Sequence, residues 1–303
     1  MFAGDIRLRR IRPAAARWER TTAECERLAE REDTENMEIK GFSTSMFGWN
    51  VNYWTQDKEP VWEEIFRECV EAGLDAVEID AVPEQTETAK ALGLAVSGTY
   101  VGLALHEPFE ALDIDNNVIP AARRLAEAGG TDLIINADPK GGWGEAQPKT
   151  EEEFRRQGDN LARIAAAVRP LGLKVSLHNH AADKHNAEGD LRSVIEYASP
   201  EVGLCIDTGW AHAAGCDPID WIRKYPDRVA ALHLRNQNGD IPTEDILTGE
   251  INMRDLIAAL AEIGYTGWLS FELWHREDNN PQRTLTEDTR LSIEGLKRWL
   301  AEF

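Results

Sequence analysis

Four short apolar segments of this chain each end in a side chain that can bind a metal ion or transfer a proton. These residues are His178 in VSLH, Asp207 in GLCID, His233 in VAALH and Glu272 in WLSFE. Parallel strands bury both faces and are therefore almost wholly apolar, whereas polar side chains are tolerated at their carboxyl ends. We therefore expect the four residues to meet at the carboxyl ends of neighbouring strands.

Two imidazoles and two carboxylates form a mixed nitrogen and oxygen ligand set. Such a set suits one divalent ion (Mn, Co, Mg, Fe or Zn) better than a metal that seeks thiolates. The ion can chelate a hydroxyl and a carbonyl oxygen of a sugar and stabilise the enediolate that forms when a base removes the α-proton. Glu272 is a candidate for both ligand and catalytic base. A lone histidine at a strand end is more often a hydrogen-bonding residue, but four polar ends on four successive strands favour a site.

The elements that must position these residues alternate regularly from Met37 onward. Eight runs are predicted as strands, at 39–45, 75–80, 94–100, 132–138, 174–180, 202–207, 229–234 and 268–273. Amphipathic helical stretches separate them, one of which opens with Thr150 and Glu153 as a capping box. The alternation also permits an open doubly wound sheet, but no glycine-rich phosphate turn follows the first strand. We therefore predict an α/β fold, a closed (β/α)₈ TIM barrel, whose active site lies at the carboxyl ends of the strands.

Side-chain direction along the strands supports this position for the site. Because strand side chains alternate in direction, each candidate ligand shares a face with the residue two positions before it. Those residues are all small, namely Ser176, Cys205, Ala231 and Ser270. Small side chains beneath a polar rim would leave room for an ion and a substrate. The bulkier neighbours are then expected to face the helices, and they are Leu177, Ile206, Leu232 and Phe271.

Bulk properties narrow the domain organisation and the class of partner. Residues 1–36 are predicted to be a flexible extension and residues 37–303 a single barrel domain. The 33 basic and 54 acidic residues give a net charge of −21, which disfavours nucleic acid and anionic lipid as partners. The sequence contains neither an apolar run of the roughly 20 residues that a membrane span needs nor a secretory apolar core. We expect a cytoplasmic protein with reduced cysteines, and a homo-oligomer remains possible.

At these motifs the chain resembles the xylose isomerase-like barrel superfamily of sugar isomerases and epimerases. The resemblance covers residues 38–302 and is most specific in LHNH at 177–180, in 206–236 and in 248–273. Members of this superfamily typically hold one divalent metal with Glu, Asp, His and Glu from strands five to eight. The resemblance thus implies that Asp207, His233 and Glu272 are ligands.

Two departures from that pattern affect the expected chemistry. The fifth-strand motif reads His-Asn-His where the superfamily has Glu-Asn-His, which places the paired-glutamate epimerase mechanism in doubt. His178 could be the fourth ligand, or His180 could act as a base, and the sequence leaves both open. In HLRN, Arg235 stands where many relatives have lysine, and we include it among the catalytic candidates. Arginine recognises oxygens through a fork of donors but is a poor proton donor at neutral pH.

Further residues near the strand ends are predicted to bind a sugar, because flat aromatic rings with a polar group pack well on its C–H faces. The substrate-binding candidates are Trp49, Trp54, Glu78, Tyr100, Asp138, Trp210, His212 and Trp274. Trp62 is instead expected to pack in a helix. The glycine-rich segment 137–150 is interpreted as a mobile lid, although an ordinary surface loop fits equally well.

The first functional hypothesis is a metal-dependent isomerase or epimerase of a free or keto sugar. A close alternative is a lyase or dehydratase acting on a keto-sugar, keto-glycoside or keto-inositol, because removal of the same α-proton precedes either outcome. Two other classes are a nuclease similar to endonuclease IV, which the net charge of −21 opposes, and a non-catalytic sugar-binding subunit. Proton exchange would distinguish a binding subunit, since binding alone has no need to labilise a C–H bond.

Overall fold

The computed structural model describes residues 37–276 and 279–303, so the extension predicted at 1–36 lies outside the described residues. Eight parallel strands of the described part form one sheet, in the order β10-β1-β2-β3-β4-β5-β6-β7. Their bounds are β1 Gly41–Ser45, β2 Ala76–Glu78, β3 Ala95–Leu103, β4 Asp132–Ala137, β5 Lys174–His178, β6 Gly203–Asp207, β7 Val229–His233 and β10 Trp268–Phe271. All eight predicted strands are confirmed.

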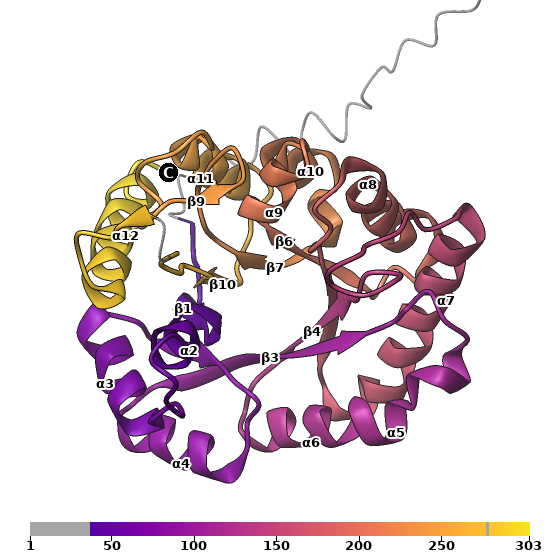
Figure 1. Ribbon diagram of the computed structural model, residues 1–303, viewed down its shortest axis with the longest axis horizontal. Coiled ribbons are helices and arrows are strands. Elements are labelled where there is room, and N and C mark those ends of the chain that lie inside the picture. The colour runs from indigo at the N-terminus through magenta and orange to yellow at the C-terminus, as the bar shows by residue number, and fades with distance from the viewer. Residues whose placement is uncertain (1–36, 277–278) are drawn as a thin grey trace, which may run out of the picture. The chain divides into compact units, whose positions relative to one another are not determined.

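The sheet closes on itself between β7 and β10. The Leu234 amide donates to the Ser270 carbonyl oxygen at 2.7 Å, and the Glu272 amide donates to the Leu234 carbonyl oxygen at 3.1 Å. Leu234 also forms a parallel bridge with Phe271. The fold is therefore the predicted (β/α)₈ barrel and not an open sheet (Figure 1).

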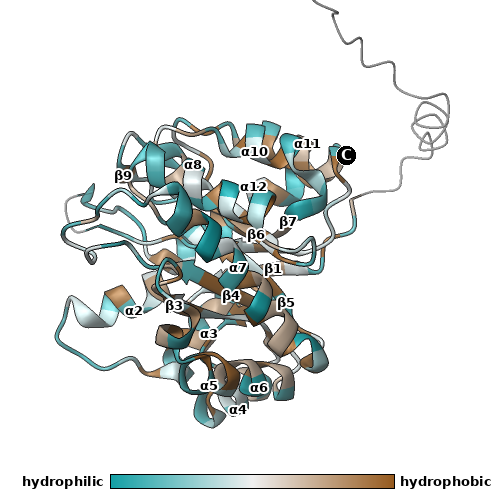
Figure 2. Cartoon of the chain, turned by 90° about the vertical axis from the view of Figure 1, so that its right-hand side faces the viewer, coloured by the Kyte–Doolittle hydropathy of each residue, from teal (hydrophilic) through white to brown (hydrophobic). Residues whose placement is uncertain are grey.

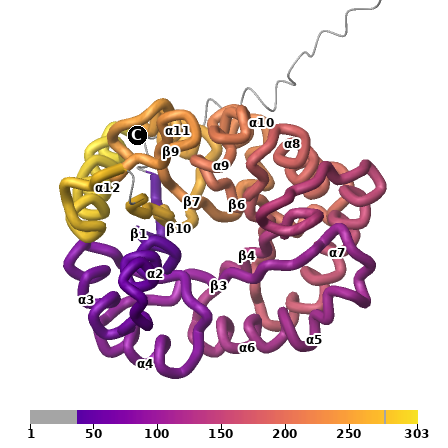
Figure 3. The backbone as a smooth tube through the Cα atoms, viewed as in Figure 1, coloured from indigo at the N-terminus to yellow at the C-terminus, as the bar shows by residue number. Residues whose placement is uncertain are grey.

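Helices surround the strands in chain order, and α12 lies beside the elements that begin the barrel (Figure 3). Their bounds are α2 Phe47–Trp54, α3 Trp62–Ala72, α4 Pro83–Ala91, α5 Ile114–Asn117, α6 Ile119–Glu127, α7 Glu151–Val168, α8 Lys184–Arg192, α9 Thr208–Ala213, α10 Pro218–Lys224, α11 Met253–Glu262 and α12 Leu285–Leu300. The predicted capping box opens α7, since the Glu153 amide donates to Thr150 Oγ1 and the Thr150 amide donates to Glu153 Oε2. None of the described helices combines the length and the apolar character of a membrane span.

The core has an outer and an inner part. Leu177, Ile206, Leu232 and Phe271 belong to the large cluster between strands and helices, as their strand positions predict. The helices of that layer carry both hydrophilic and hydrophobic residues along their length (Figure 2). Inside the barrel, a small cluster contains Cys205 and Ala231, and Tyr100 packs against it. The predicted small residues thus lie beneath the ends of the strands.

One element was not predicted from the sequence. After β7 the chain forms a two-stranded antiparallel hairpin, β8 Gln237–Asn238 and β9 Ile241–Pro242. Asn236, just before the hairpin, contacts the segment before α11. Its Nδ2 donates to the Ile246 and Ile251 carbonyl oxygens at 3.1 and 2.9 Å. The hairpin follows directly on the β7 residues that face the centre of the barrel.

Candidate active site

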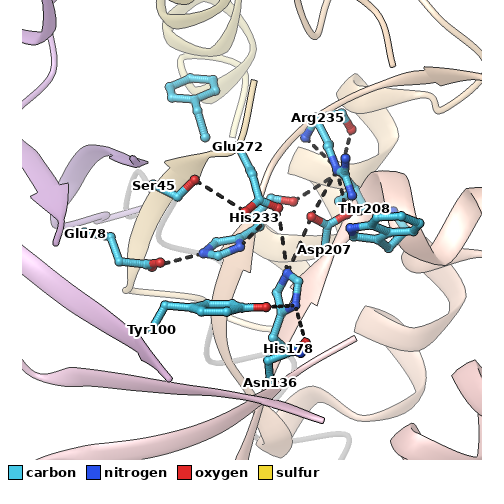
Figure 4. Close-up of polar contacts among 12 residues, drawn as sticks. Ser45, Glu78, Tyr100, Asn136, His178, Asp207, Thr208, His233, Arg235 and Glu272 are labelled. Atoms are coloured by element: carbon cyan, nitrogen blue, oxygen red, sulfur yellow. Dashed lines mark hydrogen bonds and ion pairs between the residues drawn. The ribbon is translucent and has the colours of Figure 1, made fainter. Parts of the chain in front are cut away.

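The four predicted ligands converge at the carboxyl ends of β5, β6, β7 and β10 (Figure 4). One potential ligand atom from each of His178, Asp207, His233 and Glu272 lies within 4.8 Å of the others. His178 Nε2 is 3.6 Å from Asp207 Oδ2 and 3.8 Å from Glu272 Oε2, and His233 Nδ1 is 3.5 Å from Glu272 Oε2. We call these four residues the central cluster. The structure brings His178, and not His180, into it.

The imidazoles of the central cluster have the arrangement that metal-binding histidines show. One nitrogen of each ring is engaged outside the cluster: His178 Nδ1 is 3.3 Å from the Tyr100 hydroxyl and 3.4 Å from Asn136 Oδ1, and His233 Nε2 is 3.0 Å from Glu78 Oε2. The other nitrogens, His178 Nε2 and His233 Nδ1, are buried and have no hydrogen-bond partner within the described residues. Such outer contacts fix the ring orientation of ligating histidines. The donor set and its geometry therefore fit a divalent ion.

Asp207 is held more firmly than the other members. Its side chain is fully buried and accepts from Arg235 Nε at 2.9 and 3.0 Å and from the Trp210 amide at 2.6 Å. Asn179, the middle residue of the His-Asn-His motif, brackets the Asp207 backbone with two hydrogen bonds of 2.8 and 2.9 Å. Thr208 Oγ1 in turn accepts from the Arg235 amide at 3.0 Å. Arg235 thus positions a carboxylate, a role that differs from proton transfer.

The electrostatics of the central cluster favour positive charge. Burial lowers the pKa of His178, but its contacts with Asp207 and Glu272 outweigh burial and the net shift is upward. Burial also lowers the pKa of His233, while Cys205, Glu78 and Glu272 raise it well above its ordinary value. For Glu272, burial raises the pKa, but the charge of His233 and the closeness of both imidazoles bring it well below its usual range. Acidic groups that stabilise imidazolium ions would stabilise a bound cation in the same way.

His180 lies outside the central cluster, between two indole rings. Its ring centroid is 4.7 Å from that of Trp143, 4.3 Å from that of Trp210 and 5.5 Å from that of His178. Burial, and then the charge of His178, lowers the pKa of His180 to about 3. The ring is therefore neutral at pH 7, and its Nδ1 is buried without a hydrogen-bond partner in the described part of the chain.

A cavity of about 330 Å³ opens above the cluster, and we call it the catalytic cavity. The predicted site residues that line it are Glu78, Tyr100, His180, Trp210, Arg235, Glu272 and Trp274. Glu272 reaches it from the central cluster and accepts from Ser45 Oγ at 3.4 Å. Further lining residues lie at the end of β1, in α2, after β2 and in α4, where the sequence pattern offered no histidine to mark them. They include Ser45, Phe47, Asn50, Asp80 and Gln85.

Four polar side-chain atoms of residues that line the catalytic cavity are buried and have no hydrogen-bond partner among the described residues. They are Asn50 Oδ1, Gln85 Oε1, Trp274 Nε1 and Arg235 Nη2. Leaving such an atom unpaired costs about 1–3 kcal/mol. The cavity is also lined by the polar side chains of Asn50, Glu78, Asp80 and Gln85, whose oxygens could accept from the hydroxyl groups of a ligand. The cavity is therefore suited to a polyol.

Four of the expected substrate-binding residues do not line the catalytic cavity, which corrects their placement. Trp49 is only 2% exposed, and its Nε1 donates to Thr44 Oγ1 at 3.2 Å within the core. Trp54 ends α2 and is 53% exposed. Asp138 accepts from Asn136 Nδ2 at 2.8 Å, and His212 Nε2 lies 2.7 Å from Glu250 Oε2.

Trp62 was expected to pack in a helix away from the site. It begins α3 but also lines the cavity. A side chain at the start of a helix can face the barrel mouth while the rest of the helix packs against the strands. Helical periodicity alone does not distinguish the two positions.

Comparison with curated proteins finds inosose dehydratases and a rhizopine catabolism protein among the relatives. An inosose dehydratase from Lacticaseibacillus casei is 25% identical over 142 residues, which are 41% of this chain and 48% of that protein. The match thus spans about half the length of that relative. The rhizopine catabolism protein MocC from Rhizobium meliloti is 23% identical, and the match covers 82% of this chain and 86% of that protein.

Solved structures with the same fold include two sugar epimerases. An L-ribulose 3-epimerase has a TM-score of 0.66 at 17% identity, and the match covers 87% of this chain and 95% of that one. D-Psicose 3-epimerase from Clostridium cellulolyticum H10 has a TM-score of 0.66 at 16% identity over 86% and 99% of the two chains. At these identities the likeness shows the fold. The model of the family described as xylose isomerase-like TIM barrel matches residues 66–301, and the chain belongs to this family.

Proposed function

We propose that this chain is a metal-dependent lyase that removes the proton next to the carbonyl of a keto-sugar or keto-inositol and then releases water. The observation that carries the proposal is the position of Glu272. Of the four residues in the central cluster, Glu272 is the one that also lines the catalytic cavity, whereas Asp207 is fully buried against Arg235. A carboxylate that faces both a metal site and a polyol cavity is well placed to act as a base.

His178, Asp207, His233 and Glu272 would hold the divalent ion. When bound, the ion would act as a Lewis acid that polarises the substrate carbonyl and stabilises negative charge on its oxygen. The chain's own groups orient the base, since Ser45 Oγ donates to Glu272 Oε1 at 3.4 Å. The pKa of Glu272, well below its usual range, keeps this carboxylate unprotonated at neutral pH.

The second titratable group at the cavity favours elimination over epimerisation. A two-base epimerase needs one group that holds a proton and one that does not, on opposite faces of the reacting carbon. Here Glu272 and His180 are both unprotonated at neutral pH, because their pKa values are lowered. Elimination needs one base: the C–H proton passes to Glu272, the neighbouring C–O bond breaks with its electron pair on oxygen, and the protonated Glu272 returns that proton to the leaving oxygen, which departs as water. The curated relatives named inosose dehydratase support the preference for elimination over epimerisation.

Epimerisation or isomerisation of the same substrate class is the second candidate. Glu78 supports it, because this second carboxylate lines the catalytic cavity and lies 3.0 Å from His233 Nε2. Glu78 would then deliver a proton to the other face of the enediolate. The two candidates share the first step and differ in the fate of the enediolate.

Incubation of the metal-loaded protein with keto-inositols and keto-sugars in D₂O would test the proposal. Loss of one water with appearance of an unsaturated ketone, followed by NMR and ultraviolet absorbance, is the expected result. An unchanged carbon skeleton with deuterium at the α-carbon would favour the second candidate, and no exchange with any substrate would refute both.

The Glu272→Gln variant should lower the exchange rate at least about a hundredfold, the low end of what a positioned base contributes. Bound metal would be measured in the same sample, since glutamine retains an oxygen ligand. Glu250→Gln is the matched control, because Glu250 pairs with His212 outside the catalytic cavity. Exchange at the wild-type rate in Glu272→Gln would assign the base elsewhere, with His180 and Glu78 as the next candidates.

A further inference from the structure

A second cavity of about 220 Å³ adjoins the catalytic cavity. The two share Trp143, His180 and Trp210 as lining residues, so these three side chains form the boundary between them. The remaining walls come from the end of β4 and the segment after it, at 137–149, and from the segment after β5, at 181–190. A molecule bound in the catalytic cavity would therefore have this space directly beside it.

Five of the twelve residues that line the second cavity are small and apolar. These are Ala137, Pro139, Ala146, Ala181 and Ala182. Together with the two indole rings at the boundary, they offer methyl groups and flat aromatic faces to a ligand. Such surfaces attract apolar groups through the hydrophobic effect and aromatic packing.

Apart from His180 at the boundary, the polar residues of the second cavity already bind one another or Gln157. Lys149 Nζ is 2.7 Å from Asp190 Oδ1 and 3.0 Å from Gln157 Oε1. Asp183 accepts from the amide and the Nδ2 of Asn186 at 2.9 and 2.8 Å, and Asn186 Oδ1 accepts from the Lys149 amide at 3.0 Å. In the catalytic cavity, by contrast, four buried polar atoms have no partner among the described residues. The two cavities thus differ in chemistry: one suits hydroxyl groups and the other suits an apolar group.

We propose that the second cavity binds an apolar substituent carried by the polyol ring, so that the substrate is a keto-glycoside or a similar ether with an aromatic or comparably apolar group. This inference rests on the proposed function, which places the polyol ring in the catalytic cavity. Size agrees with it, since an apolar cavity of about 150 Å³ accepts benzene and a larger one accommodates a single aromatic ring. A second sugar ring would find few free hydrogen-bond partners there.

Calorimetric titration of the metal-loaded protein with unreactive probes would test the inference. The probes are phenyl glucoside, as both anomers, and glucose. At least one phenyl anomer should bind about tenfold or more tightly than glucose, because burial of an aromatic ring contributes that much affinity. Ala182→Trp, at an exposed position on the cavity wall, should abolish this preference and leave glucose binding unchanged.

Two further variants complete the test. Ala146→Trp fills the same space from the other wall and should have the same effect, whereas Ala91→Trp, at an exposed position on α4, should keep the preference. The inference would be overturned if glucose and both phenyl anomers bound with equal affinity, or if the preference survived both filling variants. It would also be overturned if neither phenyl anomer bound up to its solubility. Failure of the proposed function would look different, because the phenyl preference would then persist while no keto substrate exchanges its α-proton.

Discussion

Replacing Arg235 by methionine would remove one charge from the buried contact that holds Asp207. Arg235 is 5% exposed, and its Nε donates to both carboxylate oxygens. The guanidinium also lies 4.9 Å from the Trp210 ring centroid. Methionine retains an apolar stem beside the indole, so the substitution mainly removes the charge and the hydrogen bonds.

The expected loss in the free energy of unfolding depends on which contacts of Asp207 remain in the variant. Breaking a buried ion pair on one side typically costs about 3–5 kcal/mol, because the remaining charge is left uncompensated. Asp207 would still accept from the Trp210 amide at 2.6 Å and lie 3.6 Å from His178 Nε2. We therefore expect the low end of the range, about 3 kcal/mol, which corresponds to a fall in Tm of roughly 6–12 °C for a domain of this size.

Urea and thermal unfolding in the presence of a chelator would measure this loss, since no ion then compensates Asp207. Arg223→Met is the matched control, because Arg223 pairs with Asp255 and Glu262 at 2.7 and 2.9 Å but is 38% exposed. An exposed pair contributes about 1 kcal/mol or less. If Arg235→Met lost no more stability than Arg223→Met, the buried contact would not have the importance that its geometry indicates.

The remaining predictions concern the metal and the amino-terminal extension. Asp207→Ala and His233→Ala should each lose nearly all bound metal, as measured by elemental analysis. His212→Ala, outside the cavity, should retain the metal. Full metal occupancy in both Asp207→Ala and His233→Ala would refute the site. Deletion of residues 1–36 should leave Tm and activity nearly unchanged, because the predicted barrel begins after them. A fall of many degrees would show that the extension contributes to the folded domain.

The barrel and the central cluster could be predicted from the sequence because both depend on regular patterns. Alternation of direction along each strand places Asp207 above Cys205, and the buried cluster of Cys205 and Ala231 inside the barrel has the composition which that alternation predicts. The capping residues Thr150 and Glu153 likewise determine a helix start through local hydrogen bonds. In both cases the physical cause lies within a few residues of its effect.

The turns after the strands were less predictable, because distant contacts set the rotation of each short helix. Gly48 lies so near the end of the barrel that a Cβ atom there would be 1.9 Å from the Leu273 carbonyl oxygen. This close approach sets which side of α2 meets the barrel, and it leaves Trp49 in the core and Trp54 in solvent. Asn50 and Gln85 were missed for a related reason, since a single amide in a helix has no pattern that marks it as facing a cavity.

The register of the barrel limits how a chain of this kind can change its length. Asp207 pairs directly with His233, and His178 pairs with Cys205, so each cluster residue depends on its strand neighbour. Inserting one residue within β6 would turn Asp207 away from the barrel interior, because successive strand side chains face opposite sides. We therefore expect insertions and deletions to be tolerated beyond the strand ends, as in the segment 138–149. Because that segment builds walls of both cavities, its length can alter the choice of substrate while the central cluster stays in place.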